Sequence, residues 1–374
     1  MIYLDAAATS LVKPLSVGRE ILRAMQSCAS PGRGGHEPAM RAAETVYRCR
    51  ETAAKLFNVP EPERVVLTSN ATHALNLALR SLVRPGMRVL ISGYEHNSVT
   101  RPLQLLEAEI HVARSPLFDR EATLAAFREQ LEEAELVVCT HVSNVFGFIL
   151  PVYALADLCR EKGVPLVVDA SQSAGVLDVD FARLGAAFVA MPGHKGLLGP
   201  QGTGLLLCGR EGEPLIAGGS GSDSREQSMP AWLPDRLEAG THNVPGAAGL
   251  TAGMRFVLER GTDAIAAHEQ AMLKELTERL SLLEGVELFT GENGTQSGVL
   301  SFRLEGVDCE EASRQLSERG VCLRSGLHCA PFAHQSAGTL ETGTIRASFS
   351  PFTTSGQLRL FAGMLGELLR QLRE

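Results

Sequence analysis

The chain has 374 residues, of which 44% are hydrophobic and 21% charged, and its formal net charge is −8 at pH 7. This length can bury the cores of two domains, and the acidic balance argues against a broad basic surface for nucleic acid. No apolar run reaches the roughly 18 residues of a membrane span. The eight cysteines are scattered, without a Cys-x-x-Cys pair or zinc-ligand spacing. We therefore expect a cytoplasmic protein with reduced thiols, no metal site and no membrane segment.

The N-terminal part of the chain predicts one short strand and two helices. Residues 2–4 are apolar, and the small residues that follow Asp5 allow another segment to pack closely against them. Apolar residues recur at helical spacing over 17–25 and again over 38–57, with a glycine-rich loop at 30–36 between them.

The middle of the chain alternates apolar runs with helical patterns. Strands are predicted at 64–69, 88–92, 136–142, 164–169 and 186–191, and helices at 74–82 and 152–162. Near-continuous Val, Leu and Ile in such strands indicates an α/β fold with a mostly parallel mixed sheet that helices cover on both faces. A polar residue ends or follows each of these five strands, and these residues are Thr72, His96, Asn144, Asp169 and Lys195. Open sheets of this kind bind their ligands at the carboxyl ends of the strands.

The C-terminal part predicts a smaller α+β domain. A loop-rich stretch at 218–224 precedes a long helical region over 244–283, and a turn is expected at 291–294. Strands at 299–304, 321–324 and 344–349 accompany a helix at 308–319. We predict a large domain over 16–252 and a small C-terminal domain over 253–374, joined by the N-terminal segment 1–15.

Lys195 lies in a glycine-rich loop directly after a predicted strand. A lysine that must lose its proton and attack a carbonyl needs such a fixed position, although a tight loop with an incidental lysine explains this stretch equally well. With Asp169 and a helix N-terminus near Thr72, the set suits pyridoxal phosphate, which needs a lysine, a carboxylate and an anion site. The alternatives are an N-cap role for either residue, or a magnesium ligand at Asp169. The sequence has no P-loop motif.

Five motifs give the chain a specific resemblance, which extends from Tyr3 to Thr354. They are His141-Val-Ser-Asn144, Asp169-x-x-Gln172, Gly193-His194-Lys195, Leu237-Glu-Ala-Gly-Thr241 and Arg324-Ser-Gly-Leu-His-Cys-Ala330. In these segments the chain resembles the cysteine desulfurase/selenocysteine lyase family, a branch of the class V aminotransferases with PLP fold type I. The resemblance implies pyridoxal 5'-phosphate (PLP) as the cofactor and L-cysteine or a close analogue as the substrate.

The resemblance also implies which residues contact the cofactor. Lys195 would bind it covalently, Asp169 would pair with the pyridine nitrogen, and His96 would stack on the ring and shuttle protons. Thr241 would reach the phosphate from a second subunit, which implies a homodimer. The full set is Thr72, His96, Asn144, Asp169, Gln172, His194, Lys195 and Thr241.

Two residues near the C-terminus complete the implied chemistry. Arg346 matches the arginine that binds the substrate carboxylate, beside Asn144, and Cys329 matches the nucleophile that takes the substrate sulfur as a persulfide. The flanking Arg324 and His328 would favour the thiolate. The interval between Cys329 and Arg346 is short, as in relatives that need a sulfur-acceptor protein. Such relatives supply sulfur for iron–sulfur clusters or thio-cofactors.

The chain departs from the family pattern near its lysine. Pro192 stands where relatives usually carry Ser or Thr, so one hydroxyl and one N–H are missing at the implied phosphate site. Three other functions remain open from the sequence. They are a selenocysteine lyase or cysteine sulfinate desulfinase, a class V aminotransferase in which Cys329 is structural, and a non-enzymatic sulfur carrier without PLP.

Overall fold

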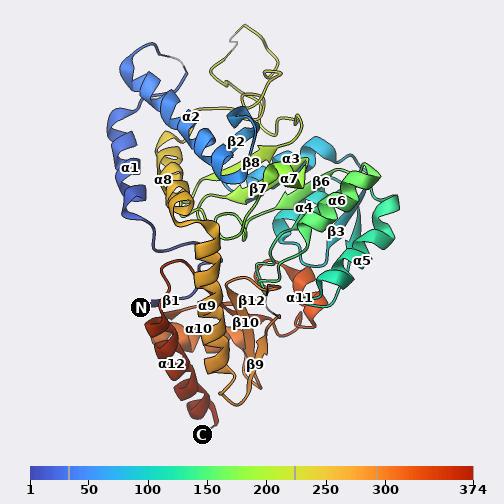
Figure 1. The fold of residues 1–374 in the computed structure, drawn as a ribbon, viewed down its shortest axis with the longest axis vertical. Helices are drawn as coiled ribbons and strands as arrows, with labels where there is room; N and C mark the ends of the chain where they lie inside the picture. Colours follow the sequence, from blue (N-terminus) through green and yellow to red (C-terminus); the bar gives the residue numbers. More distant parts are fainter. Residues whose placement is uncertain (33, 223–224, 293, 374) are drawn as a thin grey trace.

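The computed structural model describes residues 1–32, 34–222, 225–292 and 294–373. Parts of the predicted loops at 30–36 and 218–224, and of the turn at 291–294, lie outside these ranges. The described chain forms a larger part around a seven-stranded sheet and a smaller part around a four-stranded sheet (Figure 1). None of the helices within these ranges is long and apolar enough to cross a membrane.

The larger sheet is mixed, as predicted, and has the order β2-β8-β7-β6-β5-β3-β4. Adjacent strands run parallel except at β8, which is antiparallel to both of its neighbours. The strands are β2 (Val65–Thr68), β3 (Arg88–Ser92), β4 (Glu109–Ala113), β5 (Leu136–Thr140), β6 (Leu166–Asp169), β7 (Phe188–Pro192) and β8 (Gly204–Cys208). The sequence did not predict β4, a half-exposed edge strand, or β8, which directly follows the glycine-rich lysine loop.

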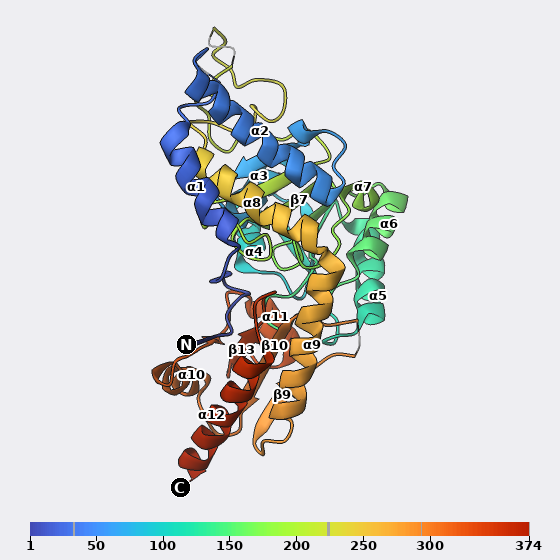
Figure 2. The ribbon, with the colours of Figure 1, turned by 60° about the vertical axis from the view of Figure 1, so that its left-hand side comes forward.

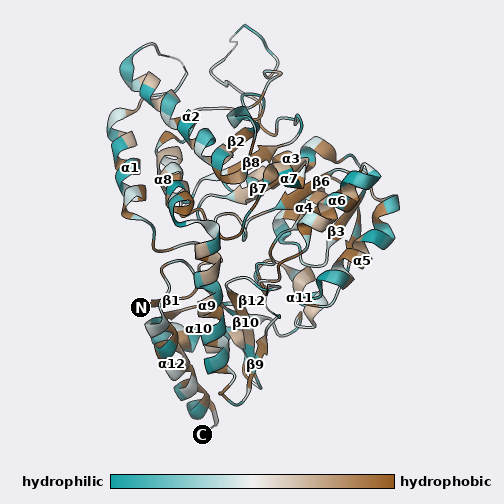
Figure 3. Ribbon diagram, viewed as in Figure 1, coloured by the Kyte–Doolittle hydropathy of each residue, from teal (hydrophilic) through white to brown (hydrophobic). Residues whose placement is uncertain are grey.

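Helices cover both faces of this sheet, because the central strands β5, β6 and β7 carry apolar side chains on both sides. One hydrophobic core joins the sheet to α2 (Glu37–Phe57), α5 (Arg120–Gln130), α6 (Val152–Lys162) and α8 (Val244–Arg260). A second core on the opposite face joins it to α3 (Ala71–Leu82) and α4 (Asn97–Leu105). The strands are apolar between helices whose outer faces are hydrophilic (Figure 3). The short α7 (Phe181–Leu184) lies beside α6, and α1 (Leu15–Ser27) packs against α8.

The smaller part contains the antiparallel sheet β12-β13-β10-β9 and its helices. These elements are β9 (Val286–Phe289), β10 (Val299–Leu304), β12 (Arg324–Gly326), β13 (Thr344–Ser348), α9 (Thr262–Leu280), α10 (Cys309–Glu318), α11 (Pro331–Ala337) and α12 (Ser355–Arg373). The N-terminal strand β1 (Ile2–Tyr3) pairs in parallel with β11 (Val321–Cys322), so the start of the chain belongs to this part (Figure 2).

The predicted long helix at 244–283 is two helices, α8 and α9. The chain turns at Gly261, whose φ of +81° is a conformation that favours glycine. Figure 2 shows α8 lying on the larger part and α9 running into the smaller one. Residue 252 falls within α8, and the proposed division of the chain at that residue stays a prediction.

Candidate active site

The carboxyl ends of four parallel strands bring the predicted polar residues to one edge of the large sheet. Asp169 is the last residue of β6 and pairs with Thr140 at the end of β5 and with Ala190 in β7. His96 follows β3, and Lys195 follows β7. The expectation that these strand ends meet is therefore correct.

Lys195 is partly buried in a loop that only glycines allow. A side chain at Gly193 would collide with Thr203, and one at Gly196 would collide with the carbonyl of Ala174. Burial lowers the pKa of Lys195 from 10.5 to about 8, against the opposing effect of Asp169, and two nearby arginines lower it further. A useful fraction of the amine is then unprotonated at neutral pH and can act as a nucleophile.

Asp169 is buried and firmly oriented. Its Oδ1 accepts hydrogen bonds from the backbone N–H of Ser171, at 2.9 Å, and from the Ser171 hydroxyl. Both of these bonds fall on one oxygen.

Nearby, Glu95 is fully buried, and its Oε1 accepts hydrogen bonds from the Ser92 hydroxyl and from the backbone N–H of Thr140. Burial raises the pKa of Glu95 to about 8, so this acid is mostly neutral at pH 7. Glu95 was not predicted, although an acid just after an apolar strand was a usable signal.

His96 is connected to the start of α3 through Ser98. The backbone N–H of Ser98 donates to Nδ1 of His96 at 3.0 Å, which places the proton of the neutral ring on Nε2. The Ser98 hydroxyl lies 2.9 Å from the same Nδ1 and 2.8 Å from Oγ1 of Thr72. Burial lowers the pKa of His96 to about 4, against the effect of Asp169. The ring is therefore neutral at pH 7, and Ser98, which the sequence did not reveal, orients it.

The N-terminal segment makes contact with two other predicted residues. Thr9 Oγ1 lies 3.1 Å from Nδ1 of His194, and the amide of Gln172 donates to the carbonyl of Ala7 at 3.0 Å. Burial lowers the pKa of His194 to about 4. The segment from Ala7 to Thr9 therefore borders the lysine loop.

Thr241 lies apart from this group. It is exposed and lines a separate cavity with Ser69 and His73. Its loop is anchored by Glu238, which forms a buried bidentate ion pair with Arg50 in α2. The structure of a single chain thus does not bring Thr241 to Lys195.

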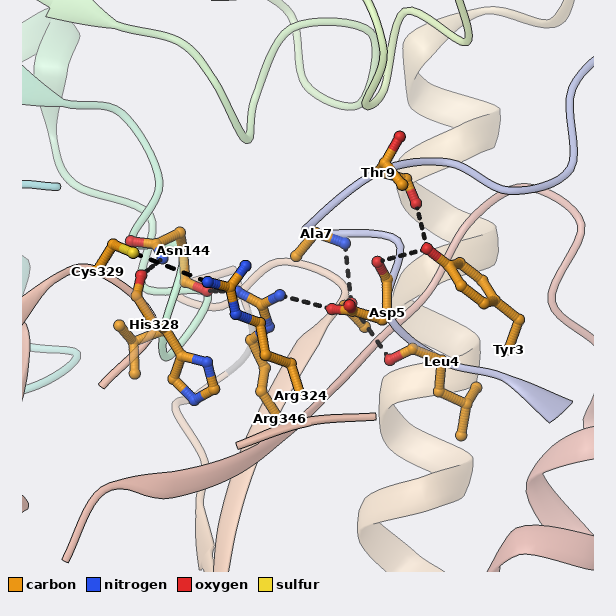
Figure 4. A network of polar contacts seen from close by, with 12 residues as sticks. Tyr3, Leu4, Asp5, Ala7, Thr9, Asn144, Arg324, His328, Cys329 and Arg346 are labelled. Atoms are coloured by element: carbon orange, nitrogen blue, oxygen red, sulfur yellow. Dashed lines mark hydrogen bonds and ion pairs between the residues drawn. The ribbon is translucent and has the colours of Figure 1, made fainter. Parts of the chain in front are cut away.

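Cys329 is exposed on a loop that is tied to the strand ends (Figure 4). The backbone N–H of Asn97 donates to the carbonyl of Cys329, and Nδ2 of Asn144 donates to the carbonyl of His328, each at 2.8 Å. His328 and Cys329 both have left-handed backbone angles, with φ of 49° and 58°. Such angles strain residues other than glycine and persist only where the surrounding contacts hold them. The loop is therefore fixed beside Asn144.

The cation beside the Cys329 sulfur is Arg324, whose Nη2 lies 3.8 Å from Sγ. His328 is buried, and its Nε2 lies 3.2 Å from the carbonyl oxygen and from the hydroxyl of Thr344. Burial lowers the pKa of His328 well below its usual value, so this ring is neutral. Of the two residues expected to favour the thiolate, Arg324 alone carries a charge to the sulfur.

Arg346 is buried to 1% exposure and held from two sides (Figure 4). Its Nη1 donates to the carbonyl of Asn144 at 2.7 Å, and its Nη2 forms an ion pair with Asp5 at 2.7 Å. Its Nε is buried and has no hydrogen-bond partner within the described chain. Asp5 was not predicted to belong to this site.

The residues at this edge fit the requirements of PLP. Lys195 offers a partly unprotonated amine, Asp169 a buried carboxylate, and His96 a flat neutral ring. At the start of α3 the backbone N–H of His73 donates to the Asn70 side chain, and the remaining N–H groups of the first turn, which have no partner inside the helix, attract phosphate. The donor set therefore suits this cofactor.

Comparisons with known proteins agree with this fit. Residues 2–361 match the family model described as aminotransferase class-V. A protein of Methanothermobacter thermautotrophicus named probable cysteine desulfurase is 34% identical over 385 residues, covering 99% of this chain and 94% of that protein.

Two solved structures have the same fold as this chain. An apo cysteine desulfurase from Thermococcus onnurineus has a TM-score of 0.90 and 30% identity, covering 99% of this chain and 95% of that one. An Escherichia coli cysteine desulfurase, described as an S-sulfonic acid, has a TM-score of 0.87 and 25% identity, with the same coverage.

Proposed function

Because the chain belongs to the class V aminotransferase family, we propose that it is a PLP-dependent cysteine desulfurase. It converts L-cysteine to L-alanine and leaves the sulfur on Cys329 as a persulfide. One observation carries this proposal: the backbone N–H of Asn97, next to His96, donates to the carbonyl of Cys329 at 2.8 Å, and Arg324 lies 3.8 Å from the Cys329 sulfur. This supports a single site in which the exposed thiol lies beside His96 at the sheet edge.

The cofactor would be held by the residues at the sheet edge. Lys195 would carry it covalently, Asp169 would face its pyridine nitrogen, and Thr72 and His194 would bind its phosphate together with the α3 N-terminus. When bound, the cofactor draws electrons from the α-carbon of the substrate. Pro192 supplies no donor here, since it has no N–H and no hydroxyl.

The protein side chains then perform three tasks. Arg346 binds the substrate carboxylate next to Asn144. His96 offers its Nε2–H and can exchange a proton with the substrate. The Cys329 thiolate attacks the substrate sulfur, so that an S–S bond forms while the C–S bond breaks. The carbon that loses sulfur takes up a proton and becomes the methyl group of alanine.

A homodimer would complete the site, with Thr241 reaching the phosphate of the partner's cofactor. The buried pair of Glu238 and Arg50 supports this proposal, because it fixes the Thr241 loop at the surface. Mixing Lys195→Ala chains with Thr241→Ala chains tests it. Mixed dimers should regain activity, since one of their two sites has both residues; mixtures no more active than either variant would contradict a shared site.

The exposure of Cys329 also supports sulfur transfer to an acceptor protein. The persulfide would stand at the surface, where a thiol of a partner can reach it, and the rigid loop would not carry it elsewhere. Supply of sulfur for iron–sulfur clusters or thio-cofactors in the cytoplasm is the corresponding proposal for the cellular role.

The activity is tested by incubating the protein with L-cysteine, PLP and a thiol reductant, which should release alanine and sulfide. Cys329→Ala should abolish both products, whereas Cys322→Ala, a change at a half-buried cysteine on β11, should not. A Cys329→Ala variant as fast as the parent would refute the nucleophile. Mass spectrometry should find one extra sulfur on Cys329 after treatment with cysteine.

The other functions give different results in the same assays. Selenocysteine or cysteine sulfinate release their side-chain groups with less help, so activity on these alone would survive Cys329→Ala. An aminotransferase would need a keto acid and form no persulfide. A carrier without PLP would be colourless. The enzyme should be yellow, and borohydride should remove its colour and leave the reduced cofactor attached to Lys195.

A further inference from the structure

Two arginines of the site face each other directly on neighbouring strands. Arg324 in β12 and Arg346 in β13 are register partners in the antiparallel sheet. Side chains at such positions stand on the same face, and like charges there repel. Burial lowers the pKa of Arg346, Asp5 opposes this effect, and Arg324 adds to it.

Asp5 is the carboxylate that balances this pair. Its Oδ1 lies 2.7 Å from Nη2 of Arg346, although the two residues are 341 positions apart in the sequence. Arg324 has no ion pair with an acidic residue of the described chain. The two arginines therefore share the single carboxylate of Asp5. The pair keeps one positive charge, which a second carboxylate can neutralise.

The backbone around Asp5 is fixed. Strand β1 pairs with β11, and Asp5 itself forms a bridge to Ser348 at the end of β13. The backbone N–H of Ser348 donates to the carbonyl of Leu4 at 2.8 Å, and the Tyr3 hydroxyl donates to the carbonyl of Asp5 at 3.1 Å. The carboxylate is thus held at Arg346 by the N-terminal segment.

The guanidinium that Asp5 holds still has donors to offer. Nη2 bonds Asp5 and Nη1 bonds the carbonyl of Asn144, while Nε is buried without a partner in the described chain. An N–H in that state costs free energy unless another group accepts from it. A planar guanidinium binds a carboxylate through two parallel N–H groups, and Nε with the second N–H of Nη2 forms such a pair.

We propose that Asp5 is a positioning residue for the substrate carboxylate. It neutralises Arg346 against Arg324 and holds the guanidinium so that the N–H groups of Nε and Nη2 can donate to the carboxylate of the incoming amino acid. The role of Asp5 rests on the proposed function, since it requires a substrate with a carboxylate. Its loss weakens substrate binding and leaves the sulfur chemistry at Cys329 intact.

Kinetics of three variants test this role. Asp5→Ala removes the charge and the acceptor, so KM for L-cysteine should rise about ten- to a hundredfold while kcat stays within about threefold. Asp5→Asn keeps an oxygen acceptor and should recover part of the loss. Asp157→Ala breaks an exposed ion pair with Arg160 and should leave both constants unchanged. Parental KM in Asp5→Ala, or an equal fall of kcat and kcat/KM, would overturn the inference.

A second measurement does not depend on activity. Phenylglyoxal modifies accessible arginines, and peptide mass spectrometry reports its reaction with Arg346, which is 1% exposed in the parent. Asp5→Ala should speed this modification, and an unchanged rate would overturn the inference. A parent enzyme that released no alanine from cysteine would refute the proposed function instead, and the modification rates would still judge whether Asp5 holds Arg346.

Discussion

The amine of Lys195 should react with acetic anhydride at an unusually low pH, because burial lowers its pKa from 10.5 to about 8. At neutral pH roughly a tenth of an amine with this pKa is unprotonated, about 300 times the fraction at the ordinary value. Only the unprotonated form reacts with the reagent. The labelling rate of Lys195 should therefore rise up to about pH 8 and then level off.

The measurement is competitive labelling of the cofactor-free protein over a pH series, read by peptide mass spectrometry. Lys162 is an internal comparison, since its hydrogen bond to Glu132 raises its pKa. Asp169→Asn should move the Lys195 midpoint lower still, because Asp169 opposes the effect of burial. Lys195 labelling that follows the profile of Lys162, or a midpoint that rises in Asp169→Asn, would refute the reasoning.

Three further predictions concern stability and loop order. Glu238→Gln leaves Arg50 as a buried unpaired charge, and urea unfolding should show that the free energy of unfolding falls by about 3–5 kcal/mol. Glu213→Gln breaks the more exposed pair of Glu213 with Arg236, and the free energy of unfolding should fall by under about 1 kcal/mol. Equal losses in the two variants would contradict the difference. Burial raises the pKa of Glu269 to about 8, because the folded protein favours the neutral carboxyl group. The contribution of this group to the stability of the folded state is fully present below its unfolded pKa and is lost as the pH rises through about 8. Glu269→Gln should therefore melt at a higher temperature than the parent at about pH 9, and a lower one would count against this sign. Asn144→Ala removes the bond to the carbonyl of His328, so amide exchange over 327–330 should accelerate about three- to tenfold; unchanged exchange would mean that other contacts hold the loop.

The fold class could be predicted because its signal is local. Continuous apolar runs identified β2, β3, β5, β6 and β7, and helical spacing identified α2 and α6. Of the strands that escaped prediction, β4 and β9 are half-exposed, and β8 directly follows a glycine-rich loop. The break at Gly261 was also missed, since a single glycine is tolerated inside a helical pattern.

Lys195, Asp169 and His96 could be grouped from the amino-acid sequence, because parallel strands place their carboxyl ends at one edge of the sheet. The sequence also marked Cys329 and Arg346 through motifs. Tertiary contacts decided how two of the groups are held, since Asn144 secures the cysteine loop and Asp5 neutralises Arg346. These contacts join segments from separate elements, and their partners are set by the packing of the two sheets, which no local pattern of residues encodes.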